Sequence, residues 1–251
     1  MSCGMTEHTV GDKTSTDVFG AGDLRAVAEA ACRGDGDAVR ALAASGVNID
    51  EPGLDGFTPL LWALTCESEP GMRALLELGA DPNHRVDRPS GQTAVLFAAT
   101  YDNGDLLRVL LEHGGNPNAV ELTRHHSALT QAISSGMGVE RDNWENYETL
   151  LAAGADLDMV ISGRETAAIF ASSMNRYCLI ISMIEDHGYS HDLYYLLLHV
   201  KSGFVPESSR AYHCKTDLIS YLEGQLNENE WNLYLEWAEG REFQDGPVER
   251  S

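Results

Sequence analysis

The segment "EDHGYSHD" at residues 185 to 192 has the side chains that most resemble a metal site in this sequence. His187 and His191 are four residues apart, which would place both imidazoles on one face of a continuous helix, with carboxylates on either side. Gly188 lies between them and is typical of the end of a helix. We therefore expect histidines exposed in a turn rather than zinc ligands, and the sequence predicts no metal site and no cofactor.

The cysteines give a second test for chemistry. There are five, at Cys3, Cys32, Cys66, Cys178 and Cys214. The number is odd, the spacings are wide and no CxxC pair occurs, which argues against a disulfide framework or a zinc module. We expect reduced thiols and a cytoplasmic location. The N-terminus has no apolar core of a signal peptide, and no apolar segment is long enough to span a membrane.

Common catalytic and phosphate-binding motifs are absent from the sequence, including G-x-S-x-G, GxxxxGK[ST] and H-E-x-x-H. A cysteine and histidine nucleophile pair has no local support either. The sequence therefore predicts that the protein is not an enzyme. A metal-dependent enzyme that uses residues 185 to 192 remains the third of three functional hypotheses.

The composition restricts the partners. Hydrophobic residues make up 43%, enough for a sizeable core, and 39 acidic against 17 basic residues give a formal net charge of −22. Such a charge argues against nucleic acid and against an anionic membrane, because both would be repelled. It favours a protein partner with a basic surface. The alternative, that the acidic residues only maintain solubility, stays open.

Two motifs recur with a shared period and predict the elements that carry these residues. Glycines that follow paired apolar residues occur at positions 46, 79, 114, 154 and 188, spaced by 33 to 40 residues. A hydroxyl residue precedes a short apolar run in each period, where it can cap a helix; these residues are Thr58, Thr93, Ser127 and Thr166. The glycine then ends a second helix, because it readily adopts the left-handed conformation. Each period is therefore a helix-turn-helix unit.

Two segments resemble the start and the end of the ankyrin repeat: Gly56-Phe57-Thr58-Pro59-Leu60 and Gly79-Ala80-Asp81-Pro82-Asn83. The usual histidine of the start is replaced by Leu61, and later repeats have alanine in place of the proline. The resemblance covers about residues 23 to 190. It implies an all-α fold, an ankyrin-repeat solenoid of helix-turn-helix units with β-hairpin-like loops and a helical C-terminal cap. It also implies protein binding, without naming the partner, since such arrays bind many unrelated targets.

The expected organisation follows the period. Residues 1–20 are polar and predict a flexible N-terminal tail. Ankyrin repeats occupy residues 21–190, with units at about 21–50, 51–84, 85–119, 120–158 and 159–190. Residues 191–240 predict a helical C-terminal repeat or cap, and 241–251 a second flexible tail. An insertion, "SSGMGVERDNWEN", separates the helices of the third complete repeat.

The resemblance also implies where a partner binds, namely the loop tips and the exposed ends of the first helices. The corresponding residues are Leu54, Asp55, Phe57, Gln92, Tyr101, Arg124, His126, Trp144, Glu165 and Met174. Phe57 and Tyr101 are the expected anchors, because aromatic side chains dominate binding hot spots. Trp62 is expected in the core. In the insertion, Trp144 and Tyr147 are either partner contacts or core residues, and Tyr147 is expected in the core.

Two functional hypotheses from the binding class follow. The first is a non-enzymatic protein that binds and inhibits another protein. Its most specific form is a cognate immunity protein that neutralises a toxin or effector with a basic surface, since small stand-alone ankyrin proteins resemble bacterial immunity proteins. The alternative is a general cytosolic scaffold or regulator without a toxin partner, whose partner need not be basic.

Overall fold

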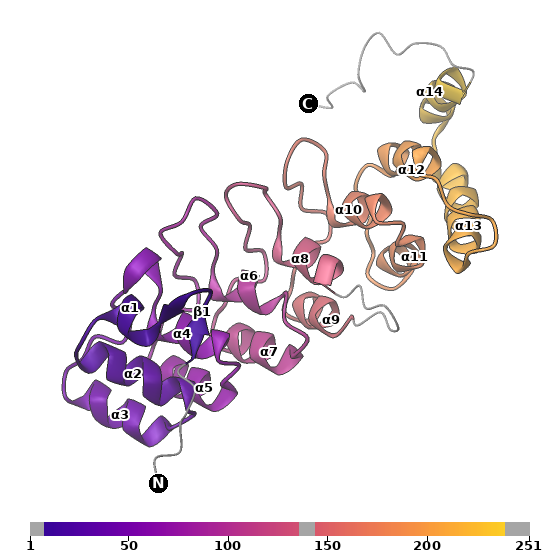
Figure 1. Cartoon of the computed structure of the whole chain (residues 1–251). Helices are drawn as coiled ribbons and strands as arrows, with labels where there is room; N and C mark the ends of the chain where they lie inside the picture. Colours follow the sequence, from indigo (N-terminus) through magenta and orange to yellow (C-terminus); the bar gives the residue numbers. More distant parts are fainter. Residues whose placement is uncertain (1–7, 136–143, 239–251) are drawn as a thin grey trace. The chain divides into compact units, whose positions relative to one another are not determined.

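The structure, a computed structural model, describes residues 8–135 and 144–238 (Figure 1). The chain divides into two compact units, Met1–Asp156 and Leu157–Ser251, called unit 1 and unit 2 below. Within the described residues the regular structure is helical, apart from one short hairpin and two isolated β-bridges. The predicted all-α fold is confirmed. The predictions for the tail at 241–251 and for residues 136–143 of the insertion lie outside the described residues.

The first described segment of unit 1 packs against α2 (Asp23–Cys32). It contains β1 (Thr9–Val10), β2 (Lys13–Thr14) and α1 (Ser15–Phe19), and the two strands pair antiparallel. The Thr14 hydroxyl accepts from the backbone N–H of Asp17, and the Asp17 carboxylate accepts from the backbone N–H of Thr14. This capping box begins α1. Val18 on α1 is buried, so the prediction of a flexible tail is wrong for residues 8–20.

Helices α2 to α9 of unit 1 form two rows (Figure 1). The first row contains α2 (Asp23–Cys32), α4 (Pro59–Thr65), α6 (Ala94–Ala98) and α8 (Ala128–Ser135). The second row contains α3 (Gly36–Ala44), α5 (Glu69–Glu77), α7 (Gly104–Glu112) and α9 (Glu145–Ala152). Neighbours in each row pack together, and each first-row helix packs against the second-row helix that follows it. Trp62 and Tyr147 are fully buried in this stack, as predicted.

Buried hydroxyl groups begin the first helices, as the spacing predicts. The side-chain oxygens of Thr58, Thr93, Ser127 and Thr166 each accept a hydrogen bond from the backbone N–H three residues later. Each of the four is at most 2% exposed. An unpaired amide is costly where water cannot reach it, so these caps stabilise helix ends inside the stack.

Gly79 shows how a second helix ends. Its φ of 94° is left-handed, and the backbone N–H of Ala80 donates to the carbonyl of Leu75 at 3.0 Å. This bond closes the last turn of α5. The other predicted helix-ending glycines, at 46, 114, 154 and 188, have positive φ as well, which confirms the prediction for all five.

The residue four positions after this glycine links one repeat to the next. The Asn83 side-chain oxygen accepts from the backbone N–H of Asn116 at 2.8 Å, and its Nδ2 donates to the carbonyl of Gly114 at 2.9 Å. The equivalent residues Asp50, Asn118 and Asp158 also accept from backbone N–H groups 31 to 38 residues later. The repeated "GADPN"-like ending therefore serves contacts between repeats as well as the end of a helix.

Unit 2 is also built from helices. It contains α10 (Ala167–Ser173), α11 (Tyr177–Glu185), α12 (Leu193–Ser202), α13 (Arg210–Gln225) and α14 (Glu228–Ala238). α12 packs against α10 and α13 against α11, so unit 2 contains two stacked helix pairs. Tyr189, only 3% exposed, shares a hydrogen bond of 3.0 Å with the Thr166 hydroxyl.

Disulfides join neighbouring helix pairs in both units. Cys32 pairs with Cys66 and Cys178 with Cys214, with Cα–Cα distances of 5.4 and 5.0 Å. The prediction of reduced thiols is wrong for these four residues. Their separations, 34 and 36 residues, match one repeat, so stacking places corresponding positions side by side. Wide spacing along the sequence does not exclude a disulfide when the fold brings the two cysteines within bonding distance.

Candidate functional site

Loops between consecutive repeats of unit 1 are hydrogen-bonded to one another. We call residues 46–57, 79–92 and 114–127 the first, second and third finger loops. The backbone N–H of Asp87 donates to the carbonyl of Asp55 at 2.9 Å, which joins the first and second. The backbone N–H of Leu122 donates to the carbonyl of Ser90 at 2.8 Å, which joins the second and third. These bonds give the three loops one connected surface.

An ion pair covers the aromatic residue of the first finger loop. The Arg88 guanidinium donates to the Asp55 carboxylate at 2.8 Å and lies 5.5 Å from the centre of the Phe57 ring. Phe57 is 3% exposed and its ring also faces Phe97. The expectation that Phe57 is an exposed anchor is therefore wrong, because the side chain points into the stack and Arg88 closes over it.

The exposed apolar residues of the finger loops are leucines. Leu54, at the start of η1 (Leu54–Gly56), is 43% exposed, and Leu122 on the third finger loop is 57% exposed. Leu54 belongs to the predicted set. Leu122 was missed, although the signal was present: it directly precedes the polar segment "TRHH" at the loop tip. Arg124 and His125 beside it are exposed too.

The other predicted binding residues are distributed over both units. Gln92, Tyr101, His126 and Trp144 are partly exposed in unit 1, whereas Glu165 and Met174 are partly exposed in unit 2. Burial, helped by the charge of Glu67, raises the pKa of Tyr101. The carbonyl of Tyr101, which lies between α6 and α7, accepts from the Asn146 side chain at 2.7 Å. This hydrogen bond links the turn between these two helices to α9.

Acidic residues on the second row of helices face arginines of the neighbouring repeat. The pairs are Arg40–Glu77, Arg73–Glu112 and Arg108–Glu145, with N–O distances of 3.7, 3.6 and 3.2 Å. All six side chains are about half exposed, so each pair contributes little to stability. The pairs nevertheless reduce the local excess of negative charge on this face.

The histidine and carboxylate cluster at 185–192 is divided between two helix ends. Gly188 has a φ of 74°, so the helix does not continue from His187 to His191. The Asp192 carboxylate caps α12 and pairs with Arg164 at 3.2 Å. The prediction that Gly188 breaks this helix is confirmed.

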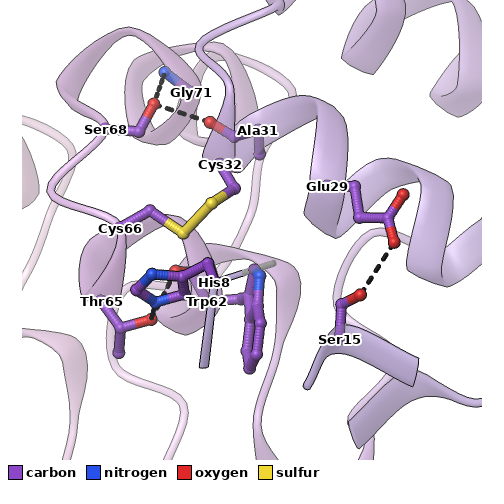
Figure 2. Close-up of a disulfide and its surroundings, with 10 residues drawn as sticks. All are labelled: His8, Ser15, Glu29, Ala31, Cys32, Trp62, Thr65, Cys66, Ser68 and Gly71. Atoms are coloured by element: carbon purple, nitrogen blue, oxygen red, sulfur yellow. Dashed lines mark hydrogen bonds between the residues drawn. A yellow bond between two sulfur atoms is a disulfide. The ribbon is translucent and has the colours of Figure 1, made fainter. Parts of the chain in front are cut away.

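Possible metal ligands lie close together at another place in the structure, away from the 185–192 segment in the sequence. Among the described residues, His8, Cys32 and Cys66 form the one group of three whose ligand atoms all lie within 4.8 Å of one another (Figure 2). The His8 ring meets the ring of buried Trp62 edge to face, with centroids 5.4 Å apart. Burial lowers the pKa of His8, which favours a neutral imidazole at neutral pH. The sequence did not indicate this group because its members come from separate elements.

Stacked helix pairs joined by finger loops define the class: a helical repeat protein with an extended surface for a partner. Family models of the ankyrin repeat match residues 55–84 and 90–121, which contain α4 to α7. The chain therefore contains ankyrin repeats, which are protein–protein interaction modules, in general without enzymatic activity. No curated protein matches the sequence. Among the helices of the described residues, none has both the length and the hydrophobicity that crossing a membrane requires.

Proposed function

We propose that the protein binds another protein through the finger loops of unit 1 and inhibits it. The observation that supports this best is the position of Leu54 and Leu122, both exposed and both on loops that are hydrogen-bonded to the second finger loop. Loops that are ordered before binding lose little conformational entropy in the complex. Exposed apolar side chains on such loops gain from burial when a partner covers them.

The partner in this proposal has a basic surface. A chain with a formal net charge of −22 attracts a basic protein at long range and so accelerates association. The most specific form of the proposal is a cognate immunity protein that neutralises a toxin or effector, such as a nuclease or phospholipase with a basic active-site surface. A general scaffold or regulator is the alternative, and its partner need not be basic.

A cytoplasmic location stays part of the proposal, but it loses one of its supporting arguments. The expectation of reduced thiols no longer supports it, since four cysteines are paired and disulfides persist mainly in oxidising compartments. Cell fractionation of the tagged full-length chain tests the location directly. Recovery in an extracytoplasmic fraction would reject the cytoplasmic assignment and leave the binding proposal unaffected.

The binding surface can be tested with matched variants. Leu54→Asp and Leu122→Asp place a charge on the finger loops, whereas Leu78→Asp places one at the end of α5, where the leucine is 40% exposed. Affinity purification from the native cells, followed by mass spectrometry, identifies the partner. We expect the two finger-loop variants to lose it and the Leu78 variant to retain it. Equal recovery with all variants would exclude the finger loops.

Two further measurements separate an inhibitor from a scaffold. Deletion of the gene should make cells sensitive to the partner, and the purified chain should suppress the partner's activity. The association rate should fall steeply as ionic strength rises, because salt screens the attraction between opposite charges. A neutral partner, with unchanged tolerance after deletion, would reject the immunity role and leave the scaffold role.

A further inference from the structure

We propose that His8, Cys32 and Cys66 bind one Zn²⁺ ion when the disulfide between the two cysteines is reduced. The site would be a redox-controlled metal site in unit 1, distinct from the finger loops. Two thiolates and one imidazole are the ligand types that Zn²⁺ prefers. The fourth position of the tetrahedron would be open to water, because the described residues offer three ligands within reach.

The backbone geometry allows the change from disulfide to metal ligands. Tetrahedral coordination with Zn–S bonds of about 2.3 Å places two sulfur atoms about 3.8 Å apart. The Cα atoms of Cys32 and Cys66 are 5.4 Å apart, so rotation of the side chains can provide this separation without movement of the helices. Cys32 is the last residue of α2 and Cys66 directly follows α4. Packing of these helices therefore fixes both ligands before the metal arrives.

Hydrogen bonds select the His8 tautomer that a metal needs. The Thr65 hydroxyl donates its hydrogen to the carbonyl of Trp62 at 2.7 Å, so its oxygen is left as an acceptor. His8 Nε2 lies 3.1 Å from that oxygen and must be the protonated nitrogen of the neutral ring. The lone pair then belongs to Nδ1. Figure 2 shows the imidazole beside both the Thr65 hydroxyl and the disulfide.

Thr65 thus has the role of an outer-sphere residue that orients a metal-binding histidine. The contact of His8 with the Trp62 ring holds the imidazole plane in the same place. Trp62 is 1% exposed and cannot move away without disrupting the stack. The third ligand is therefore positioned by neighbouring contacts, although it lies outside the helices.

The chemical balance requires a dithiol reductant. Thiol–disulfide exchange breaks the Cys32–Cys66 bond, oxidises the dithiol to its disulfide and leaves two protein thiols. Zn²⁺ then replaces the two thiol protons, which are released to solvent. Oxidation by a disulfide compound reverses the sequence and expels the ion.

The second disulfide provides an internal control. Cys178 and Cys214 have a similar Cα–Cα distance of 5.0 Å and a similar separation of 36 residues. Within the described residues, however, this pair belongs to no group of three possible ligands. Reduction should therefore create a metal site at the first pair and none at the second.

The experiment measures zinc in the reduced full-length chain. All proteins carry Cys3→Ser, so that this residue outside the described part cannot supply a thiolate. After reduction by a dithiol and removal of the reductant without oxygen, Zn²⁺ is titrated against a chromophoric chelator. We expect one Zn²⁺ per chain, no binding in the oxidised chain, and one Zn²⁺ in the reduced Cys178→Ser/Cys214→Ser variant.

Ligand variants decide the assignment. His8→Ala should weaken zinc binding at least tenfold, and Thr65→Val should weaken it by about 10- to 100-fold, the range for an orienting residue. Both variants keep the cysteine pair, so they remain informative even if Cys32→Ser/Cys66→Ser does not fold. Replacing Zn²⁺ with Co²⁺ adds a spectroscopic signature, namely thiolate-to-cobalt charge-transfer bands. These bands should disappear in Cys32→Ser/Cys66→Ser and persist in Cys178→Ser/Cys214→Ser. Zinc affinity unchanged in His8→Ala, or no binding by the reduced chain, would overturn the proposal.

Discussion

Removal of the Cys32–Cys66 disulfide should destabilise unit 1 by an amount that follows from its place in the repeat. The perturbation is the double substitution Cys32→Ser/Cys66→Ser in oxidised protein with a chelator present. The disulfide closes a loop of 34 residues, and the chain-entropy relation for that length gives about 12 to 13 cal/mol/K. At 25 °C this corresponds to about 4 kcal/mol of unfolding free energy. The loop of 36 residues at Cys178–Cys214 predicts nearly the same value, because the dependence on length is logarithmic.

Hydrogen exchange read by mass spectrometry is the appropriate assay, because it reports on the two units separately. Cys32→Ser/Cys66→Ser should reduce protection in α2 and α4 and leave α11 and α13 protected. Cys178→Ser/Cys214→Ser should give the opposite pattern. Denaturant titration supplies the total change in free energy. A loss below about 1 kcal/mol for the first pair would refute the entropic reasoning, and equal loss of protection in both units would refute its local action.

Three further predictions test contacts between repeats. Gly71→Ala should lower the unfolding free energy by about 3 kcal/mol, because its new Cβ would lie 1.8 Å from the backbone oxygen of Ala31. At Gly104 the three atoms nearest to a new Cβ belong to the flexible side chain of Glu145, so Gly104→Ala should cost under about 1 kcal/mol. Urea titrations that rank the two variants equally would contradict this. Asn83→Ala should lower the unfolding free energy by about 1 to 2 kcal/mol, and Asn83→Asp should lower it less, since aspartate still accepts from the backbone N–H of Asn116. Identical denaturation midpoints for the two variants and the unmodified chain would count against the link between repeats. Burial raises the pKa of Tyr189 to about 12 from 10.0, so the folded state retains this proton more strongly than the unfolded chain. The contribution of Tyr189 to the unfolding free energy should stay constant below about pH 10 and fall by about 2 to 3 kcal/mol by pH 12. Alkaline denaturation of Tyr189→Phe should lack this loss of stability.

Local hydrogen bonding explains which parts of the fold were predictable. The hydroxyl that caps a helix bonds to an amide three residues away, and the helix-ending glycine needs only its own left-handed φ. Both requirements act within a few residues, so they leave a recurring mark in the sequence. The burial of Trp62 follows in the same way from its place in a short apolar run.

The site was less predictable, because its residues act across repeats. Phe57 was expected at the surface from its position in the repeat pattern, and the pattern does not contain Arg88, which covers it from the next finger loop. Leu122 owes its exposure to the tip of a loop whose path is fixed by a bond to Ser90. Neither relationship is visible from neighbouring residues in the chain.

The sequence by itself determined the unit: two short helices, a hydroxyl cap, a glycine exit and a period near 34 residues, because each depends on interactions within one turn or one loop. Only the tertiary structure decided which residues meet across that period. Stacking brings Cys32 against Cys66 and places His8 beside both, and it turns separate loops into one hydrogen-bonded surface. Such contacts form only when one repeat has another to pack against, so their identity depends on the register between repeats rather than on any single segment.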